Sequence, residues 1–140
     1  MGAVTKVKAG EPTLWSSPLH LAKKADGSWG PCGDYRNLNS KTEHDSFPLS
    51  NLRNEAPKLK GCTLFTTVDL YRAYYNIQLS ESASSKTTLH TPWGTYKFKR
   101  LAMGLKNSAQ SFQRLMSTVL DGLQGVFVYL DADTTDESDC

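Results

Sequence analysis

Several features that would assign this chain to a class at once are scarce or missing. It has only three cysteines, an odd number at long spacings, so neither a disulfide framework nor a zinc site is indicated. The longest aliphatic and aromatic run, residues 126–130, has five residues, whereas a bilayer span needs roughly 20. The opening residues lack the apolar core of a signal peptide, and Lys6 stands where myristoylation requires Ser or Thr. We therefore expect an intracellular protein with no membrane partner, and the choice between cytoplasm and nucleus stays open.

Charge is distributed unevenly along the chain. The 16 Lys and Arg and 14 Asp and Glu give a net charge of +2. Five of the 14 acids lie in the last ten residues, which contain no Lys or Arg, so the first 130 residues carry 16 basic against nine acidic side chains. A basic body favours polyanions such as nucleic acid, whereas an acidic end either binds a divalent metal or stays solvated.

Turn residues indicate two hairpins. The length of 140 residues allows one ordinary domain. Residues 25–27 separate two apolar segments and predict a first hairpin, with Lys24 at its tip, and residues 90–99 predict a second. Residues 1–12 show no periodicity and read as a loose lead-in, while residues 37–46 are a polar stretch.

Apolar periodicity predicts one long helix. Apolar residues recur at three- and four-residue steps through residues 108–123. Asn107 is a suitable N-cap with Gln110 three residues later, and Gly122 or Gly125 can end the helix. The apolar stripe indicates core packing rather than a cofactor site.

The remaining segments are shorter. Residues 49–61 predict a short helix that Pro and Gly close, and residues 71–77 predict one helical turn. Residues 63–70 and 126–130 are rich in β-branched and aromatic residues and predict buried strands. Strands, helices and hairpins alternate without a regular order, which indicates an α+β fold.

Asp69 and Asp131 each follow one of the two predicted buried strands. A carboxylate at such a place pays a large desolvation cost unless a cation meets it. If the strands are neighbours, the two carboxylates converge and Mg²⁺ relieves their repulsion. Two such ions about 3.5–4 Å apart activate a 3′-hydroxyl and stabilise a leaving pyrophosphate. The alternative is that both are ordinary cap or turn carboxylates.

Five motifs occur in one order along the chain. They are SPLHLAKKADGSW (17–29), CGDYRNLN (32–39), TVDL (67–70), MGLKNS with FQRLM (103–116) and VYLD (128–131). This series resembles the reverse transcriptase of gypsy-type long-terminal-repeat retrotransposons over residues 15–132.

The resemblance implies a partial right-hand polymerase fold, with fingers up to about residue 54 and the palm from about residue 60. It divides the chain into a lead-in (1–14), a fingers and palm fragment (15–133) and an acidic tail (134–140), with the thumb absent. It also implies an RNA-directed DNA polymerase that uses Mg²⁺, with Mn²⁺ as the alternative. Its partners would be an RNA or DNA template with primer, deoxynucleoside triphosphates and the remainder of a Pol polyprotein.

The resemblance also implies roles for individual residues. Asp69 and Asp131 match the catalytic carboxylates, which would bind metal together with the carbonyl of Leu70. The expected nucleotide-binding residues are Lys24, Ala73, Tyr74 and Met103, and the expected template-binding residues are Asp34, Arg36 and Gly104. The residues alone also allow a solvated hairpin tip at Lys24, a structural ion pair at Arg36 and ordinary packing at Tyr74.

Three departures from the family pattern bear on activity. Ala132 follows Asp131 where the family has a second aspartate, and Gly30 follows Trp29 where the family has an arginine that grips the triphosphate. Residues 134–140 are acidic where a returning strand is expected. Our hypothesis is that this chain has little or no polymerase activity. The alternatives are a non-catalytic, nucleic-acid-binding remnant of a polyprotein and a decayed fragment without function.

Overall fold

The computed structural model describes residues 2–23 and 27–130, and its centre is a mixed five-stranded sheet. The spatial order of the strands is β1–β5–β4–β2–β3. β2 and β4 are parallel, and the other neighbours are antiparallel. The strands are β1 (Val4–Lys6), β2 (Ser17–Lys23), β3 (Trp29–Gly33), β4 (Leu89–Thr91) and β5 (Gly94–Phe98).

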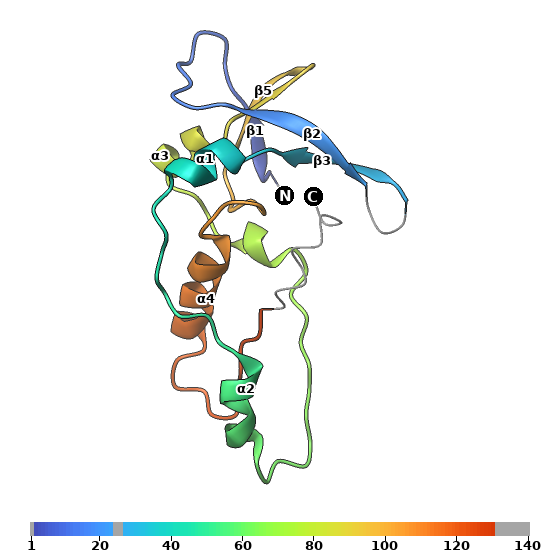
Figure 1. Ribbon diagram of the computed structural model, residues 1–140, viewed down its shortest axis with the longest axis vertical. Coiled ribbons are helices and arrows are strands. Elements are labelled where there is room, and N and C mark those ends of the chain that lie inside the picture. The colour runs from blue at the N-terminus through green and yellow to red at the C-terminus, as the bar shows by residue number, and fades with distance from the viewer. Residues whose placement is uncertain (1, 24–26, 131–140) are drawn as a thin grey trace.

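The helices are short, apart from α4. Figure 1 shows the sheet at one end of an elongated molecule, with α4 running away from it and α2 near the far end. The mixture of strands and helices confirms the expected α+β class. The helical elements are α1 (Arg36–Lys41), α2 (Leu52–Glu55), η1 (Ala56–Leu59), η2 (Ala73–Asn76), α3 (Glu81–Lys86) and α4 (Ser108–Val119), where η marks a 3₁₀ helix.

Both predicted hairpins form. β2 pairs with β3 from Leu19 opposite Gly33 to Lys23 opposite Trp29, and β4 pairs with β5 around the turn before Gly94. The expectation of a loose opening segment is wrong for β1, which pairs antiparallel with β5. The reason is that β5 presents a second edge whose backbone groups need partners, and an extended segment supplies them without any apolar pattern.

The core is a cluster of buried residues around Leu89 of β4, Tyr35 and Ala102. Gly33 lets β3 approach this core, because a Cβ atom there would lie 2.8 Å from Leu89 Cδ2 and 2.8 Å from Tyr35 Cζ. Real Cβ atoms do not tolerate such distances, so the packing requires glycine. Four partly buried residues complete the cluster: Leu19, Leu38, Phe98 and Leu105.

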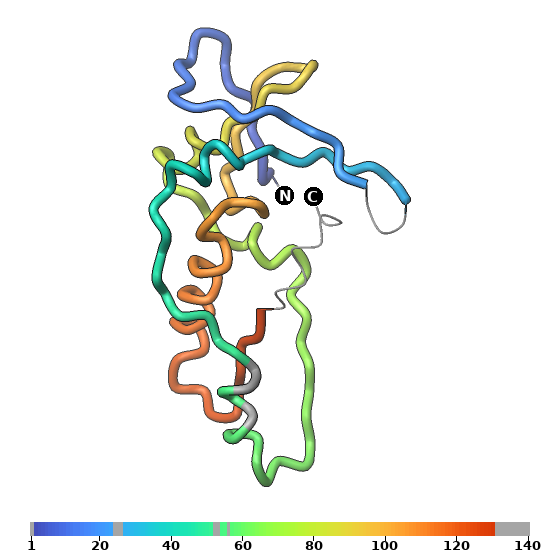
Figure 2. Tube along the Cα trace, in the orientation of Figure 1, coloured from blue at the N-terminus to red at the C-terminus, as the bar shows by residue number. Residues whose placement is uncertain are grey.

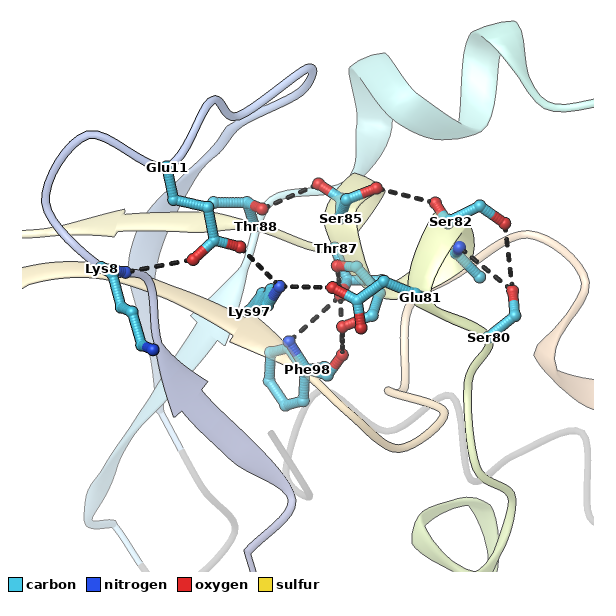
Figure 3. A network of polar contacts seen from close by, with 12 residues as sticks. Lys8, Glu11, Ser80, Glu81, Ser82, Ser85, Thr87, Thr88, Lys97 and Phe98 are labelled. Atoms are coloured by element: carbon cyan, nitrogen blue, oxygen red, sulfur yellow. Dashed lines mark hydrogen bonds and ion pairs between the residues drawn. The ribbon is translucent and has the colours of Figure 1, made fainter.

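An ion-pair network fastens the opening segment to the sheet. Lys97 Nζ in β5 lies 2.8 Å from Glu11 Oε1 and 2.6 Å from Glu81 Oε1 (Figure 3). Glu11 also accepts a 3.2 Å hydrogen bond from the backbone amide of Lys8. Beside this lysine, the hydroxyls of Ser84 and Thr87 bond to the backbone of Phe98. The network therefore joins the lead-in, α3 and β5.

The two predicted buried strands, residues 63–70 and 126–130, are not strands. Within the part of the chain that the structure describes, neither segment forms a β-ladder. Leu64 is 87% exposed and Val68 is 79% exposed. Figure 2 shows the first segment as an extended trace along one side of the molecule. The apolar residues have strand propensity, but a strand requires an adjacent strand, and no described residue supplies one.

The predicted long helix forms as α4, four residues shorter at its end than expected. Phe112 is buried, whereas Val119 at the end of the helix and Leu123, four residues beyond it, are exposed. Asn107 stands at the N-cap position, but its side chain makes no capping hydrogen bond. Its amide bonds to another segment instead, as described below.

The structure also bears on membrane spans and on the state of the cysteines. Among the described residues, no helix is long and apolar enough to cross a membrane. Cys62 is a free, exposed thiol. Cys32 is disulfide-bonded, which the spacing of the cysteines did not predict.

Candidate active site

Asp69 lies in an extended segment, four residues before η2. Its side chain is exposed, and it forms no hydrogen bond or ion pair with any residue that the structure describes. Leu70 beside it is 45% exposed. Asp131 lies outside the described residues, so the expected convergence of the two carboxylates stays a prediction. Over residues 2–23 and 27–130, no group of three or more His, Cys, Asp or Glu gathers to hold a metal ion.

The donor atoms around Asp69 suit a hard divalent cation. The Asp69 carboxylate is exposed and has no cationic partner among the described residues, and the adjacent Leu70 carbonyl also offers oxygen, the donor that Mg²⁺ and Mn²⁺ prefer. Mg²⁺ in proteins is held by one or two carboxylates together with substrate phosphates, so Asp69 supplies only part of the oxygen ligands that such a site needs. The described residues therefore fit one half of a metal site.

Tyr74 is fixed by the helix on which it packs. Arg72, with φ of 50°, turns the chain through the left-handed region and starts η2, which carries Ala73 and Tyr74. The Tyr74 ring meets Phe112 of α4 edge to face, with centroids 5.6 Å apart and an interplanar angle of 64°. Burial raises the pKa of Tyr74, so its phenol stays neutral at physiological pH.

The loop between β5 and α4 contains Met103 and Gly104. Met103 is half-buried, and Gly104 is exposed with φ of 81°, a conformation that favours glycine. Asn39 of α1 binds this loop at two points. Its Nδ2 donates to the Gly104 carbonyl at 2.7 Å, and its Oδ1 accepts from the Lys106 amide at 2.9 Å. Sequence reasoning gave Asn39 no role, because nothing local marks a contact between residues 65 positions apart.

A second asparagine continues this connection. Asn107 Nδ2 donates to the Glu43 carbonyl at 2.8 Å, and Asn107 Oδ1 accepts from the Asp45 amide at 3.1 Å. Asp45 in turn accepts two hydrogen bonds, of 2.9 and 2.8 Å, from Arg114 Nη2. The segment after α1 is thereby fastened along the start of α4, which explains why Asn107 does not cap its own helix.

Asp34 and Arg36 form a forked ion pair. Arg36 Nε lies 2.9 Å from Asp34 Oδ1, and Arg36 Nη2 lies 2.6 Å from Asp34 Oδ2. The Arg36 guanidinium lowers the pKa of Asp34 to about 2. The ion-pair interpretation of Arg36 is thus confirmed, while a template contact stays a prediction. Lys24, the expected contact to the triphosphate, lies outside the described residues.

The structure brings part of the predicted site together. η2 carries Ala73 and Tyr74, and Leu101, which precedes the loop of Met103 and Gly104, donates from its amide to the Ile77 carbonyl at 2.9 Å. Tyr74 therefore lies on an element that is hydrogen-bonded to the segment leading into Met103 and Gly104. Asp69 precedes this assembly in the chain.

Comparison with known proteins gives sequence matches over most of the chain. A family model described as "Reverse transcriptase (RNA-dependent DNA polymerase)" matches residues 22–135. The chain is 39% identical over 100 residues to "Retrovirus-related Pol polyprotein from transposon 297" of Drosophila melanogaster, a match that covers 70% of this chain and 9% of that protein. It is 32% identical over 102 residues to "RNA-directed DNA polymerase homolog" of Oenothera berteroana, covering 71% and 72%. The chain spans about a tenth of the length of the Pol polyproteins from transposons 297 and 412 that it matches.

Two solved structures share the fold. A foamy viral protease-reverse transcriptase in complex with RNA/DNA hybrid matches 93% of this chain and 17% of its own, with a TM-score of 0.70 and 19% sequence identity. A second foamy viral structure, in complex with double-stranded DNA, matches 93% and 22% with a TM-score of 0.73 and 19% identity. At these identities the similarity concerns the fold alone.

Proposed function

Because the chain belongs to the reverse transcriptase family, we propose that it supplies the fingers and the first part of the palm of an RNA-directed DNA polymerase. The fold expectation and the resemblance to gypsy-type retrotransposons are confirmed, since the gypsy Pol polyprotein of Drosophila melanogaster is 36% identical over 100 residues. The division into a lead-in (1–14), a polymerase fragment (15–133) and a tail (134–140) is part of the proposal.

One observation carries this proposal. η2 begins four residues after Asp69, packs through Tyr74 on Phe112 of α4, and is bonded to the segment that leads into Met103 and Gly104. A nucleotide that binds at Asp69 would therefore be oriented by a tyrosine ring that is itself held by packing on α4.

The family implies the use of a divalent metal. Asp69, the Leu70 carbonyl and Asp131 would hold it, with Mg²⁺ favoured and Mn²⁺ as the alternative. A metal held there would supply a lowered pKa of the attacking 3′-hydroxyl and would offset charge on the phosphates. Tyr74, whose ring Phe112 supports, would exclude a ribose 2′-hydroxyl by its bulk.

The remaining roles follow the same proposal. Lys24, Ala73 and Met103 would contact a deoxynucleoside triphosphate, and Asp34, Arg36 and Gly104 would border the template. The template would be RNA or DNA with a primer. The two foamy viral relatives of the same fold are complexes with RNA/DNA hybrid and with double-stranded DNA, which supports this choice of partner.

Primer extension tests the proposed activity. We expect the unmodified chain to extend a primer weakly with Mg²⁺ or Mn²⁺, because Ala132 and Gly30 replace a carboxylate and a phosphate-binding arginine. Ala132→Asp with Gly30→Arg should increase extension, and adding Asp69→Asn should abolish that increase. If the unmodified chain extends the primer strongly and Asp69→Asn abolishes this extension, the hypothesis of impaired activity is rejected and the hypothesis of polymerase activity is retained. No extension by any variant would count against the polymerase.

The charge of the chain favours a second candidate function, binding nucleic acid without catalysis. The first 130 residues carry 16 basic and nine acidic side chains, and Lys23 ends β2 in an exposed position. Such a protein should bind a primer–template duplex with an affinity that falls steeply as salt rises. Lys24→Ala should weaken this binding, whereas Asp69→Asn should not. The absence of binding at low salt would exclude this candidate.

A further inference from the structure

An exposed tryptophan stands at the tip of the β4–β5 hairpin. Trp93 is 74% exposed, and its indole makes no ring or cation–π contact with any described residue. Figure 1 shows this hairpin projecting from the sheet, at the end of the molecule opposite to α2. A single exposed apolar side chain is ordinary by itself. The turn that carries Trp93 and the cation beside that turn make it the start of a binding site.

Hydrogen bonds fix the turn on which Trp93 stands. Thr91 and Gly94 are paired across the hairpin, with only Pro92 and Trp93 between them. Thr91 Oγ1 accepts a hydrogen bond from the Trp93 amide at 3.2 Å and donates one to the Gly94 carbonyl at 2.7 Å. Pro92 restricts the turn further, because its ring fixes φ. The backbone that carries the indole is thus already ordered, and a ligand does not have to order it on binding.

Lys6 of β1 places a cation beside the same turn. It pairs with Tyr96 of β5, and Gly94 lies two residues along β5 on the same face of the sheet. A Cβ atom on Gly94 would lie 2.9 Å from Lys6 Cε and 3.5 Å from Lys6 Nζ, so the lysine side chain lies where the glycine leaves room. Lys6 is exposed, and no carboxylate in the described part of the chain forms an ion pair with it. Its charge is therefore available to an anion, next to the residue that follows Trp93.

We propose that Trp93 and Lys6 bind single-stranded nucleic acid, with an unpaired base stacked on the indole and a phosphate at the Lys6 ammonium group. An exposed aromatic face and a neighbouring cation match the flat base and the charged phosphate of a nucleotide. Interior bases of a duplex are covered on both faces by their neighbours, so only an unpaired base can stack on Trp93. The excess of basic side chains in the first 130 residues also favours a polyanion. Stacking and charge attraction need neither Asp69 nor a metal, so the site does not rest on polymerase activity.

The test titrates oligonucleotides of about ten nucleotides into the ¹⁵N-labelled 140-residue chain, without metal or deoxynucleoside triphosphate. Oligothymidylate and oligouridylate distinguish DNA from RNA as the source of the unpaired bases. An abasic strand of the same length keeps the phosphates and removes the bases. We expect a saturable shift of the Trp93 indole signal with at least one of the two strands, and about tenfold weaker binding of the abasic strand. The chain has three tryptophans, and the variant Trp93→Phe shows which indole signal belongs to Trp93.

Matched substitutions separate stacking from general attraction. Trp93→Ala should weaken binding of the preferred strand about tenfold, and Trp93→Phe, which keeps an aromatic face, should weaken it less. Leu14→Ala is the control for an exposed apolar side chain, since Leu14 is 85% exposed, and it should leave binding unchanged. Lys6→Gln should weaken binding about two- to fivefold at low salt. Lys8→Gln removes the same charge from another exposed position, two residues away, and should weaken binding less.

The proposal is overturned if neither strand gives a saturable shift, if the abasic strand binds equally well, or if Trp93→Ala binds as tightly as the unmodified chain. Trp93 is exposed, so its substitution leaves folding nearly unchanged and the binding result is interpretable. Equal losses for Lys6→Gln and Lys8→Gln would reject the phosphate contact at Lys6. An equal shift of the Trp93 indole with a blunt duplex of the same length would reject an unpaired base as the ligand. None of these measurements involves primer extension, so a chain without polymerase activity still tests the site.

Discussion

At the scale of single residues, Gly33 offers the most direct test of the core. Gly33→Ala would place a methyl group 2.8 Å from Leu89 Cδ2 and from Tyr35 Cζ. Both neighbours are buried and have little room to move, so we expect the free energy of unfolding to fall by about 1–3 kcal/mol. Urea denaturation measures this change. Gly2→Ala is the control, since a Cβ atom there meets nothing within 4 Å. Equal stability of the two variants would contradict the packing around β3.

A second residue-scale prediction concerns the forked pair of Asp34 and Arg36. Arg36 holds the pKa of Asp34 at about 2, below its ordinary value of 3.8. A carboxyl group whose pKa is lower in the folded than in the unfolded protein stabilises the fold when the pH is above the unfolded-state pKa. That stabilisation disappears as the pH falls through the folded-state pKa. Stability from this pair should therefore be lost between about pH 4 and pH 2.

Carboxyl ¹³C NMR titration of Asp34 checks this prediction. Arg36→Gln should return the pKa of Asp34 toward 3.8. Arg36→Lys keeps the positive charge without the fork, so its pKa should lie between those of the other two proteins. Because Arg36 is 90% exposed, added salt should also raise the pKa of Asp34 in the unmodified chain. A titration that Arg36→Gln does not change would show that the pair does not exist in solution.

At the scale of elements, Lys97 of β5 forms ion pairs with Glu11, in the segment after β1, and with Glu81, at the start of α3. Glu11→Gln removes the ion pair to the opening segment and leaves the pair between Lys97 and Glu81. Hydrogen exchange should then become faster at Lys6 and Val7, while the amides of β2 and β3 keep their rates. Glu81→Gln is the matched control on the same lysine and should instead loosen α3. If both variants change the same amides, the network does not divide in this way.

The same scale shows how far the sequence predicts the fold. Residues 108–119 form α4, because the helical period of apolar residues is a local property and the burial of Phe112 in the core stabilises the helix. Residues 63–70 have the composition of a strand, yet a strand depends on a neighbour that composition does not reveal. β1 is the converse case, since it has no apolar pattern and forms by pairing with β5.

The candidate site divides in the same manner. Asp69 and Tyr74 belong to a contiguous motif, so their places in the chain can be found from the sequence alone. The support of the Gly104 loop by Asn39 joins residues 65 positions apart, and only the folded chain brings them together. The sequence allows Arg36 either a template contact or a structural ion pair, and only the folded geometry shows its ion pair with Asp34.

At the scale of the whole molecule, the protein has a packed end and an extended end. The buried hydrophobic residues gather at the sheet and at the start of α4, whereas Leu64, Val68 and Leu123 are exposed. Such an arrangement should respond unequally to the same substitution. Leu89→Ser in the core should cost about 2–5 kcal/mol, while Leu64→Ser should change the free energy of unfolding by no more than about 0.5 kcal/mol. A similar loss in both variants would mean that residues 63–70 pack in solution.

Hydrogen exchange tests the two ends without any substitution. Amides within the β2–β3 and β4–β5 ladders are bonded to partner strands and should exchange orders of magnitude more slowly than those of an unstructured peptide. Amides 63–70 have no bonded partner among the described residues, so they should exchange within about tenfold of the unstructured rate. Protection of residues 63–70 equal to that of β2 would require a neighbouring strand, and Asp69 would then end a buried strand, as its sequence predicts. The exchange rate at this one segment therefore decides whether the carboxylate of the candidate site stands on a flexible or a rigid support.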